Sequence, residues 1–499
     1  MLAACGSSGE SFQFAPKFLF GTAIAGFQVD MGCPTLPASL CEDPNSDWFQ
    51  FVTSPVITGN TAARVKGDHP NLGPGHWELY ELDYELASRD LKNNAMRFSF
   101  EWSRIFPTAT DAATDFQSLR ALASPEALAH YHAELAAMKA RGLKPFATLN
   151  HYTLPTWIHD TVACHQNLNT CTKRGWLDSE RTIREIAKFA GFCAKEFGGE
   201  VDLWATQNES FTSIAIAGYL FQTEIRSNPP AVSLRVEEAK TVYRALIEAH
   251  ARMYDAVKAN DTIDADGDGV KALVGLVYPM VPFNPKNPAN PLDVQAAKDT
   301  FYLWNMAFLN GVAAGKFDTN IDGNAVVRDD LKGRMDFIGV NYYGSARVEG
   351  LSGPAFPQLS PLTTFNPLTF ESGLSDPKGL YDMIMTVKRE FGLPVIISEN
   401  GIVDPNDDGT APEFIVRHLQ WVWRAIADGA DVRGYFYWTL MDNYEWHLGV
   451  DFRMGLFAVD NRNPRKPRTA RKAVEVYRRI AEAKKIPDDL LKKYPEPKK

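Results

Sequence analysis

The sequence lacks several features that would place it in common classes of protein. No stretch approaches the roughly 18 consecutive apolar residues that a membrane-spanning helix needs. Basic side chains are the minority, with 52 Lys and Arg against 61 Asp and Glu and a net charge of −9, whereas nucleic-acid binding requires clustered positive charge. Hydrophobic residues make up 45% of the 499 residues. The composition predicts a soluble globular protein with a large core and no nucleic-acid partner.

Cysteine is also scarce, but the positions of the six cysteines are informative. Cys33 and Cys41 bracket a proline-containing stretch, Cys164 and Cys171 bracket a polar one, and neither spacing is typical of a metal site. We expect both pairs to form disulfides, which would indicate an oxidising compartment. The alternative is four unlinked surface thiols. Cys193 lies in a helical pattern and is expected to be a small buried hydrophobe.

The two ends of the chain differ in composition from its body. Residues 1–5 read Met-Leu-Ala-Ala-Cys and resemble a bacterial lipobox, in which the cysteine is lipidated. We expect residues 1–14 to be a tether that anchors an exported protein through Cys5, in the periplasm or at the cell surface. A chance Ala-Ala-Cys in a disordered tail is the alternative. The lysine-rich residues 483–499 are expected to form a polar, solvated tail.

Short β-rich runs alternate with longer amphipathic patterns along residues 15–482. The expected strands are residues 18–27, 95–102, 144–152, 202–209, 272–280, 337–344, 395–401 and 432–440. The expected helices include residues 125–141, 180–197, 236–260, 294–312 and 412–428. This α/β alternation predicts a single (β/α)₈ TIM barrel with long βα loops. A doubly wound open sheet is the alternative, but residues 20–26 lack its glycine-rich phosphate turn.

Polar side chains lie where most of these strands end, which is where barrel enzymes carry their active sites. Two of them are glutamates: Glu209 closes the fourth run and Glu399 lies near the end of the seventh. A pair of carboxylates is the minimum chemical equipment for cleaving a glycosidic bond. The pair therefore suggests glycoside hydrolysis.

Six segments, in this order, resemble glycoside hydrolase family 1, the β-glucosidase family. They are residues 18–23, 97–105, 206–209, 337–343, 398–401 and 442–446. The resemblance implies a retaining exo-β-glycosidase that hydrolyses unphosphorylated β-glucosides and related β-glycosides through a covalent glycosyl-enzyme intermediate, without a cofactor. The alternatives are a carbohydrate-binding or sensing protein that kept the sugar pocket, and a transglycosidase.

The resemblance also assigns residue roles. It implies that Glu399 is the nucleophile and Glu209 the acid/base, with Arg97 and Tyr343 beside the nucleophile and Asn341 on the same strand face as Tyr343. Amide, imidazole, carboxylate and indole groups are expected to hold the sugar hydroxyls and the apolar face of the ring. The residues implied for this are Gln28, His151, Asn208, Trp438, Glu445 and Trp446.

Three residues depart from the family pattern. Asp30 replaces a glutamate, Tyr152 stands where tryptophan or phenylalanine is common, and Ser210 stands where proline is usual. The segment after Trp446 lacks the Ser, Lys and Tyr set that binds a 6-phosphate in the phospho-β-glycosidase branch. An unphosphorylated sugar is therefore favoured.

One further motif carries carboxylates outside this set. Asp264, Asp266 and Asp268, with glycines between and after them, match the first half of a calcium loop. The twelfth position is Gly275, so the bidentate glutamate of an EF-hand is absent. We expect either a smaller structural calcium site or an ordinary Asp-Gly turn.

Overall fold

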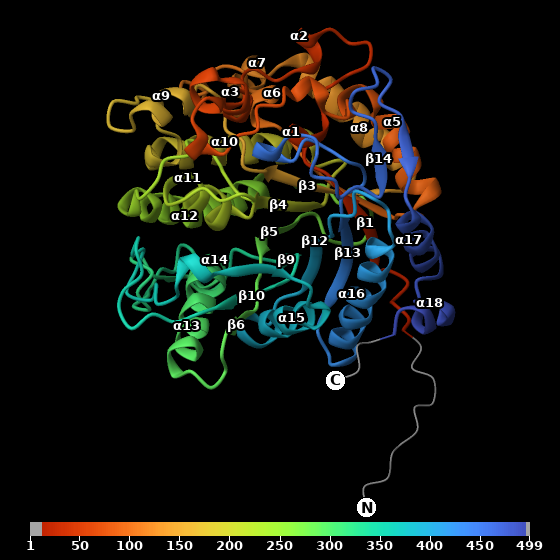
Figure 1. Cartoon of the computed structure of the whole chain (residues 1–499). Coiled ribbons are helices and arrows are strands. Elements are labelled where there is room, and N and C mark those ends of the chain that lie inside the picture. The colour runs from red at the N-terminus through yellow and green to blue at the C-terminus, as the bar shows by residue number, and fades with distance from the viewer. Residues whose placement is uncertain (1–11, 496–499) are drawn as a thin grey trace, which may run out of the picture.

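The computed structural model describes residues 12–495, and its centre is a closed barrel of eight parallel strands in the order β1-β13-β12-β9-β5-β4-β3-β2 (Figure 1). The barrel strands are β1 (Leu19–Ala23), β2 (Ala95–Ser99), β3 (Lys144–Asn150), β4 (Leu203–Asn208), β5 (Leu273–Pro279), β9 (Phe337–Tyr342), β12 (Val395–Asn400) and β13 (Val432–Trp438). All eight coincide with expected strands. The predicted (β/α)₈ barrel is confirmed.

Helices surround the barrel (Figure 1). The outer helices are α5 (His76–Glu85), α8 (Pro125–Ala140), α10 (Ser179–Phe197), α12 (Val236–Asn260), α13 (Pro291–Phe301), α14 (Ala307–Ala314), α15 (Pro377–Phe391), α16 (Thr410–Ala427) and α17 (Lys472–Ala483). The expected helix over 294–312 is divided into α13 and α14, with a wider turn over Tyr302–Met306 between them. The other four expected helices are present within about two residues of their predicted ends.

Short elements fill the loops at both ends of the barrel. The short helices are α1 (Gly26–Val29), α2 (Ala38–Cys41), α3 (Asp47–Thr53), α4 (Pro55–Thr58), α6 (Trp102–Ile105), α7 (Phe116–Leu122), α9 (Thr161–Gln166), α11 (Ala217–Tyr219) and α18 (Asp488–Lys493). The minor strands are β6 (Phe283–Pro285), β7 (Lys316–Phe317), β8 (Val326–Val327), β10 (Ser345–Val348), β11 (Glu371–Leu374), β14 (Phe457–Val459) and β15 (Arg468–Ala470). They form small sheets outside the barrel.

Aromatic rings fill the inside of the barrel. Phe146 of β3 packs edge-on against Phe337 and Phe436, with ring centroids 5.7 and 5.6 Å apart. Gly275 of β5 makes room for this layer, because a Cβ there would lie 2.8 Å from the Phe337 ring. This part of the barrel is thus a packed core rather than a pore.

The first strand is shorter than expected. The prediction extended it to residue 27, but β1 ends at Ala23 and the chain turns into α1 at Gly26. The Gly26 N–H donates to Ser99 Oγ at 2.8 Å, so the loop is tied to the end of β2. Gln28 therefore projects from a helical turn and not from a strand.

The C-terminal segment is not a solvated tail over the part that the structure describes. Ile486 is fully buried, Leu490 of α18 is 3% exposed, and the Ile486 N–H donates to the Phe12 carbonyl at 3.0 Å. The burial of Ile486 and Leu490 outweighs the polarity of the neighbouring lysines, because removing apolar side chains from water lowers the free energy of the folded state. The prediction of a free tail over residues 483–499 was wrong for this part.

The cysteine predictions are confirmed for the residues that the structure describes. Cys33 bonds to Cys41 and Cys164 to Cys171, while Cys193 is a buried free thiol. The lipobox-like Cys5 lies outside the described residues, but the expected tether over residues 1–14 was wrong for its described part, because Phe12 and Phe14 are buried in the core. Within residues 12–495, no helix is both long and apolar enough to cross a bilayer.

Candidate active site

The two candidate carboxylates lie at the C-terminal end of the barrel. Glu399 is the penultimate residue of β12, and Glu209 directly follows the last residue of β4. Glu209 has a left-handed backbone (φ 44°), although its N–H still bonds to the Val277 carbonyl of β5 at 3.0 Å. Such a conformation is costly for a residue with a side chain and is typical of functional sites.

The Glu399 carboxylate is held by a cation and a hydroxyl. Arg97 Nη1 lies 2.5 Å from Oε1, and the Tyr343 hydroxyl donates to Oε2 at 2.6 Å. Burial raises the pKa of Glu399 above its ordinary value; Arg97 opposes that rise, and Glu209 adds to it. Glu399 is thus oriented at both oxygens.

The Glu209 carboxylate has a different set of donors. Asn341 Nδ2 donates to Oε1 at 2.9 Å, and the Tyr152 hydroxyl donates to Oε2 at 2.7 Å. Arg226 Nη2 lies 3.2 Å from Oε2. The sequence drew attention to Tyr152 only as a departure from the family pattern, and it did not indicate Arg226, which lies in a loop without a motif.

Asn208 connects the two carboxylate environments. Its side-chain oxygen accepts from Arg97 Nη2 at 2.8 Å and from Asn341 Nδ2 at 3.2 Å. Its amide nitrogen contacts His151 Nε2 at 3.0 Å. One amide therefore fixes the donors of both glutamates.

The candidate sugar-binding residues are also brought together. Gln28 Nε2 donates to Glu445 Oε2 at 3.0 Å, and the His151 ring lies nearly parallel to Trp438 and Trp446, with centroids 6.0 and 5.8 Å away. Gln28 Oε1 and His151 Nδ1 are buried without a partner among the described residues. They are available to sugar hydroxyls.

Burial sets the charge of two of these groups. It depresses the pKa of His151 well below its ordinary value, as do the cations of Arg97 and Arg226, so the ring is neutral. Burial raises the pKa of Glu445 to about 8; Arg226 opposes the rise, and Glu399 adds to it. A neutral imidazole and a carboxyl group suit hydroxyl ligands.

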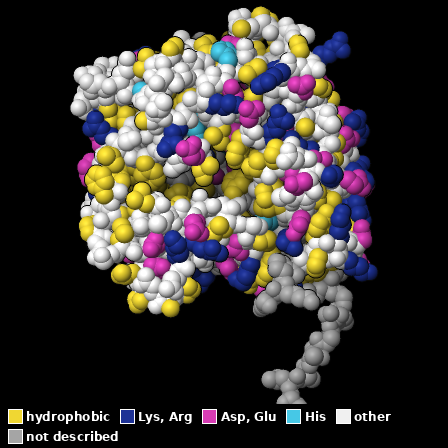
Figure 2. Space-filling model, in the orientation of Figure 1, with side chains coloured by type: hydrophobic (Ala, Val, Ile, Leu, Met, Phe, Trp, Pro, Cys, Tyr) yellow, Lys and Arg dark blue, Asp and Glu magenta, His cyan; other side chains and the backbone are white. Residues whose placement is uncertain are grey.

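Figure 2 shows hydrophobic side chains around a hollow near the middle of the visible face, where Figure 1 places the barrel strands.

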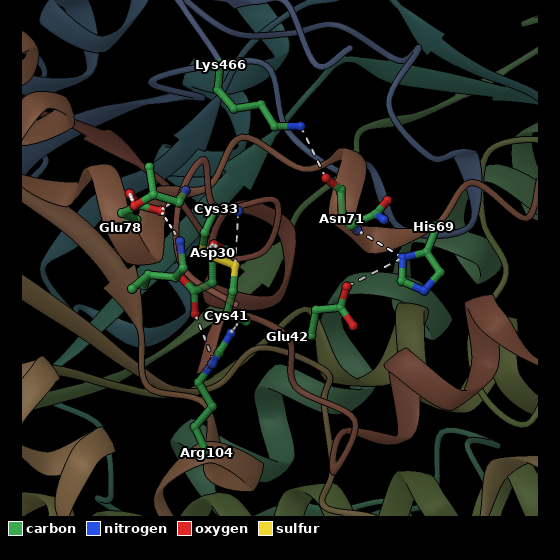
Figure 3. The surroundings of a disulfide bond; sticks show 11 residues. Asp30, Cys33, Cys41, Glu42, His69, Asn71, Glu78, Arg104 and Lys466 are labelled. Carbon is green, nitrogen blue, oxygen red and sulfur yellow. Dashed lines mark hydrogen bonds and ion pairs between the residues drawn. A yellow bond between two sulfur atoms is a disulfide. The ribbon is translucent and has the colours of Figure 1, made fainter. Parts of the chain in front are cut away.

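The substituted residues Asp30 and Ser210 have partners of their own. Figure 3 shows the Asp30 carboxylate directed at Arg104 beside the Cys33–Cys41 disulfide, and the Asp30 Oδ2 to Arg104 Nε distance is 3.3 Å. Ser210 donates to Gln207 Oε1 at 2.7 Å. Neither replacement removes a group from around the glutamates.

The loop of Asp264, Asp266 and Asp268, which the sequence left open between a calcium site and an ordinary turn, is only partly assembled as a ligand set. Asp264 and Asp266 gather with Asp202, which the sequence did not suggest, whereas Asp268 is outside the cluster. Asp264 accepts the N–H groups of residues 267–269, and Lys144 Nζ pairs with Asp266. Backbone donors and a lysine thus satisfy these carboxylates, as in an ordinary Asp-Gly turn.

Fold and site together define a class of enzyme. A (β/α)₈ barrel holds two buried glutamates at its mouth, one oriented by arginine and tyrosine and the other by an amide and a second tyrosine. Neutral polar groups and indole rings line the adjacent space. This is the arrangement of a glycoside hydrolase that works with two carboxyl groups.

Comparisons with known proteins identify the family. The sequence profile of glycosyl hydrolase family 1 matches residues 10–486. The chain is 35% identical to the β-galactosidase of Pyrococcus woesei, over 96% of this chain and 100% of that one. The β-glycosidase of Thermosphaera aggregans has a similar structure, with a TM-score of 0.80, 30% identity and coverage of 96% and 99%. The β-glucosidase of Pyrococcus furiosus gives a TM-score of 0.79, 30% identity and coverage of 97% and 99%.

The chain belongs to glycosyl hydrolase family 1. It is a retaining O-glycoside hydrolase, and its catalysis needs no cofactor.

Proposed function

We propose that the enzyme is an exo-β-glycosidase that prefers unphosphorylated β-glucosides and accepts related β-glycosides. The observation that carries this proposal is the Gln28–Glu445 pair, joined at 3.0 Å beside the His151 and Trp446 rings. A primary amide and a carboxyl group bind neighbouring hydroxyls in two directions. The pair adds no positive charge, which a sugar phosphate would require.

In the proposed mechanism Glu399 attacks the anomeric carbon while Glu209 gives its proton to the leaving oxygen. Arg97 and Tyr343 hold the attacking carboxylate, and Asn341 orients the acid. Glu209 then removes a proton from water, which displaces Glu399 from the sugar. Two displacements at one carbon return the β configuration.

The nucleophile is tested by trapping. A 2-deoxy-2-fluoro β-glucoside with an activated leaving group should label Glu399 in a one-to-one ratio, and peptide mass spectrometry locates the label. Glu399→Gln provides the control and should remain unlabelled. A label on another carboxylate, or none on folded wild-type enzyme, refutes the assignment.

Substrate preference is tested with a panel. Nitrophenyl β-glucoside, β-galactoside, β-fucoside, β-mannoside and glucoside 6-phosphate should show the highest kcat/KM for the glucoside and the lowest for the phosphate. A higher value for the 6-phosphate contradicts the proposal. Product analysis with added alcohol acceptors measures how much glycosyl transfer accompanies hydrolysis.

We also propose that the protein is exported and held at a bacterial membrane by a lipid on Cys5. The lipobox-like sequence supports this, and so do two disulfides within a chain that has only six cysteines, because disulfides persist in oxidising compartments. The enzyme should partition with membranes, and Cys5→Ser should release it. Equal partitioning of both forms contradicts the anchor.

A further inference from the structure

Arg226 places a cation beside the proposed acid Glu209. It lies in the connection between β4 and α12, in a tight turn closed by Thr223 N–H to the Arg226 carbonyl at 2.8 Å. Arg226 Nη2 lies 3.2 Å from Glu209 Oε2, and Nη1 lies 3.4 Å from the Tyr152 hydroxyl. The side chain is 38% exposed, so Arg226 contacts the acid while part of its side chain stays in solvent.

The charge of Arg226 is balanced in only one half of the reaction. Among residues 12–495 its ion-pair partner is Glu209. Glu209 must carry a proton when it acts as the acid, and it is then neutral. The nearby Glu445 is hydrogen-bonded to Gln28 instead and forms no ion pair with Arg226 among the described residues; burial raises its pKa to about 8, although Arg226 opposes that rise. The cation therefore lacks an anion at the stage when the intact glycoside is bound.

The surroundings of Arg226 combine apolar surface with positive charge. Ile225 is 58% exposed and Phe221, on the same loop, is 37% exposed. The neighbouring Glu224 is paired with Arg64. Burial lowers the pKa of His447 to about 4, and the charges of Arg226 and Arg64 add to this fall.

We propose that Arg226 forms an aglycone subsite for glycosides whose leaving group carries a carboxylate close to the glycosidic oxygen, such as carboxylated aryl glycosides. This inference rests on the proposed hydrolase mechanism. The leaving oxygen must contact Glu209, so an anion a few bonds beyond it meets the guanidinium. The carboxylate then balances the cation while Glu209 is protonated.

The test compares substrates that differ in one charge. The 3- and 4-carboxyphenyl β-glucosides are matched with the 3- and 4-carbamoylphenyl β-glucosides, and the kcat/KM ratio of each acid to its amide is measured. A charge-assisted hydrogen bond at a partly exposed site should make this ratio fall about tenfold in Arg226→Gln. Arg226→Lys should keep part of the preference. Comparing ratios cancels any general loss that Arg226→Gln causes through Glu209.

Arg235→Gln is the matched control. Arg235 ends the same connection, is 40% exposed and pairs with Glu238 at 3.7 Å, away from Glu209. It should keep the wild-type ratio. In the wild type the ratio should also fall as salt is raised to about 1 M, where charges are screened beyond about 3 Å, and this arm needs no variant.

The possible outcomes distinguish failure of the subsite proposal from failure of the proposed hydrolase function. One outcome overturns the subsite and leaves the hydrolase function intact. In that case the enzyme hydrolyses the amides, and neither Arg226→Gln nor salt changes the acid-to-amide ratio of kcat/KM. Preference for glucoside 6-phosphate over the carboxylated aglycones also overturns the subsite, because the cation would then serve the sugar. Failure to cleave any of these glycosides, together with no label on Glu399, overturns the mechanism itself.

Discussion

Single side chains decide how the two glutamates differ. Tyr152, a departure from the family pattern, donates to Glu209 Oε2 at 2.7 Å, whereas a phenylalanine there would leave that oxygen without this donor. The tyrosine is buried, with 4% exposure, so its hydrogen bond is strengthened by low local polarity. The substitution therefore changes the immediate environment of the proposed acid.

Tyr152→Phe should lower kcat/KM on alkyl β-glucosides about tenfold or more, because Glu209 becomes charged as it gives up its proton, and a buried hydrogen bond to a charged group contributes about 1.5–3 kcal/mol. Steady-state kinetics measure the change. Tyr84→Phe is the matched control, since Tyr84 also donates to a buried carboxylate, Glu134 Oε2, at 2.8 Å. The control should lose stability and keep its kcat/KM. Equal kinetic losses in both variants would show that Tyr152 has only a structural role.

Glu209→Gln should separate substrates by leaving group. Loss of a general acid costs about 10²- to 10⁴-fold, and the loss should appear in full on alkyl glucosides. Dinitrophenyl glucosides need no proton on the leaving oxygen, so their first step should be nearly unaffected. Pre-steady-state kinetics on both substrates check this. A similar loss on both would contradict the role of Glu209 as the acid.

Glu101 links stability to pH. It is 1% exposed and accepts from Ser99 Oγ at 2.9 Å and Thr153 Oγ1 at 2.7 Å. Burial raises its pKa from 4.5 to about 8, and Asp30 and Asp43 add to the rise. The folded protein thus keeps a proton that the unfolded chain releases, so the contribution of Glu101 to stability falls as the pH rises from about 4.5 to about 8.

Glu101→Gln should remove this dependence. The difference in unfolding free energy, variant minus wild type, should increase by about 2–4 kcal/mol as the pH is raised from 5 to 8. Urea unfolding at several pH values measures both, and Glu390→Gln, at an exposed position, serves as the control. Parallel curves for wild type and Glu101→Gln would show that Glu101 is ionised in the folded protein.

At the scale of elements, the two disulfides close short loops in different places. Cys33–Cys41 closes the loop that follows α1, which carries Gln28. Cys164–Cys171 closes a loop that begins in α9. Arg104 Nη2 also donates to the Cys41 carbonyl at 2.7 Å, so the first loop is fixed at its far end to α6.

Replacing either cysteine pair by alanines should cost about 2–3 kcal/mol of unfolding free energy through loop-closure entropy. Only the loss of Cys33–Cys41 should also raise KM, because Gln28 then loses part of its positioning. Denaturant unfolding and steady-state kinetics measure both double variants, and each variant is the control for the other. An unchanged KM in the Cys33→Ala/Cys41→Ala variant would show that α1 is positioned without the disulfide.

Elements with strong local patterns could be predicted from the sequence, and elements fixed by distant contacts could not. The eight strands are apolar runs, and most of them end at or beside polar residues, so the local pattern locates them. The turn at Gly26 depends on a bond to Ser99, 73 residues away, which no local pattern contains. Arg226 is similar: it reaches Glu209 from a loop whose path is fixed by the surrounding fold.

At the scale of the molecule, the C-terminal segment packs against the N-terminal end of the described chain, where the Ile486 N–H donates to the Phe12 carbonyl. Leu490→Ala should cost about 2–5 kcal/mol, the usual range for a buried leucine. Lys492→Ala, on the exposed side of α18, should change the unfolding free energy little. Denaturant unfolding compares the two. Equal stabilities would mean that α18 contributes nothing to the fold.

The two ends of the described chain and the active site lie at opposite ends of the barrel. The chain enters β1 from Phe12 at the strand's N-terminal end, where it also meets Ile486. Glu209 and Glu399 lie at the opposite pole, at the C-terminal ends of the parallel strands. An enzyme held to a surface by its N-terminal end would face outward, with its mouth toward the medium and its packed floor toward the support. Immobilisation through this end should therefore leave access to bulky glycosides unhindered.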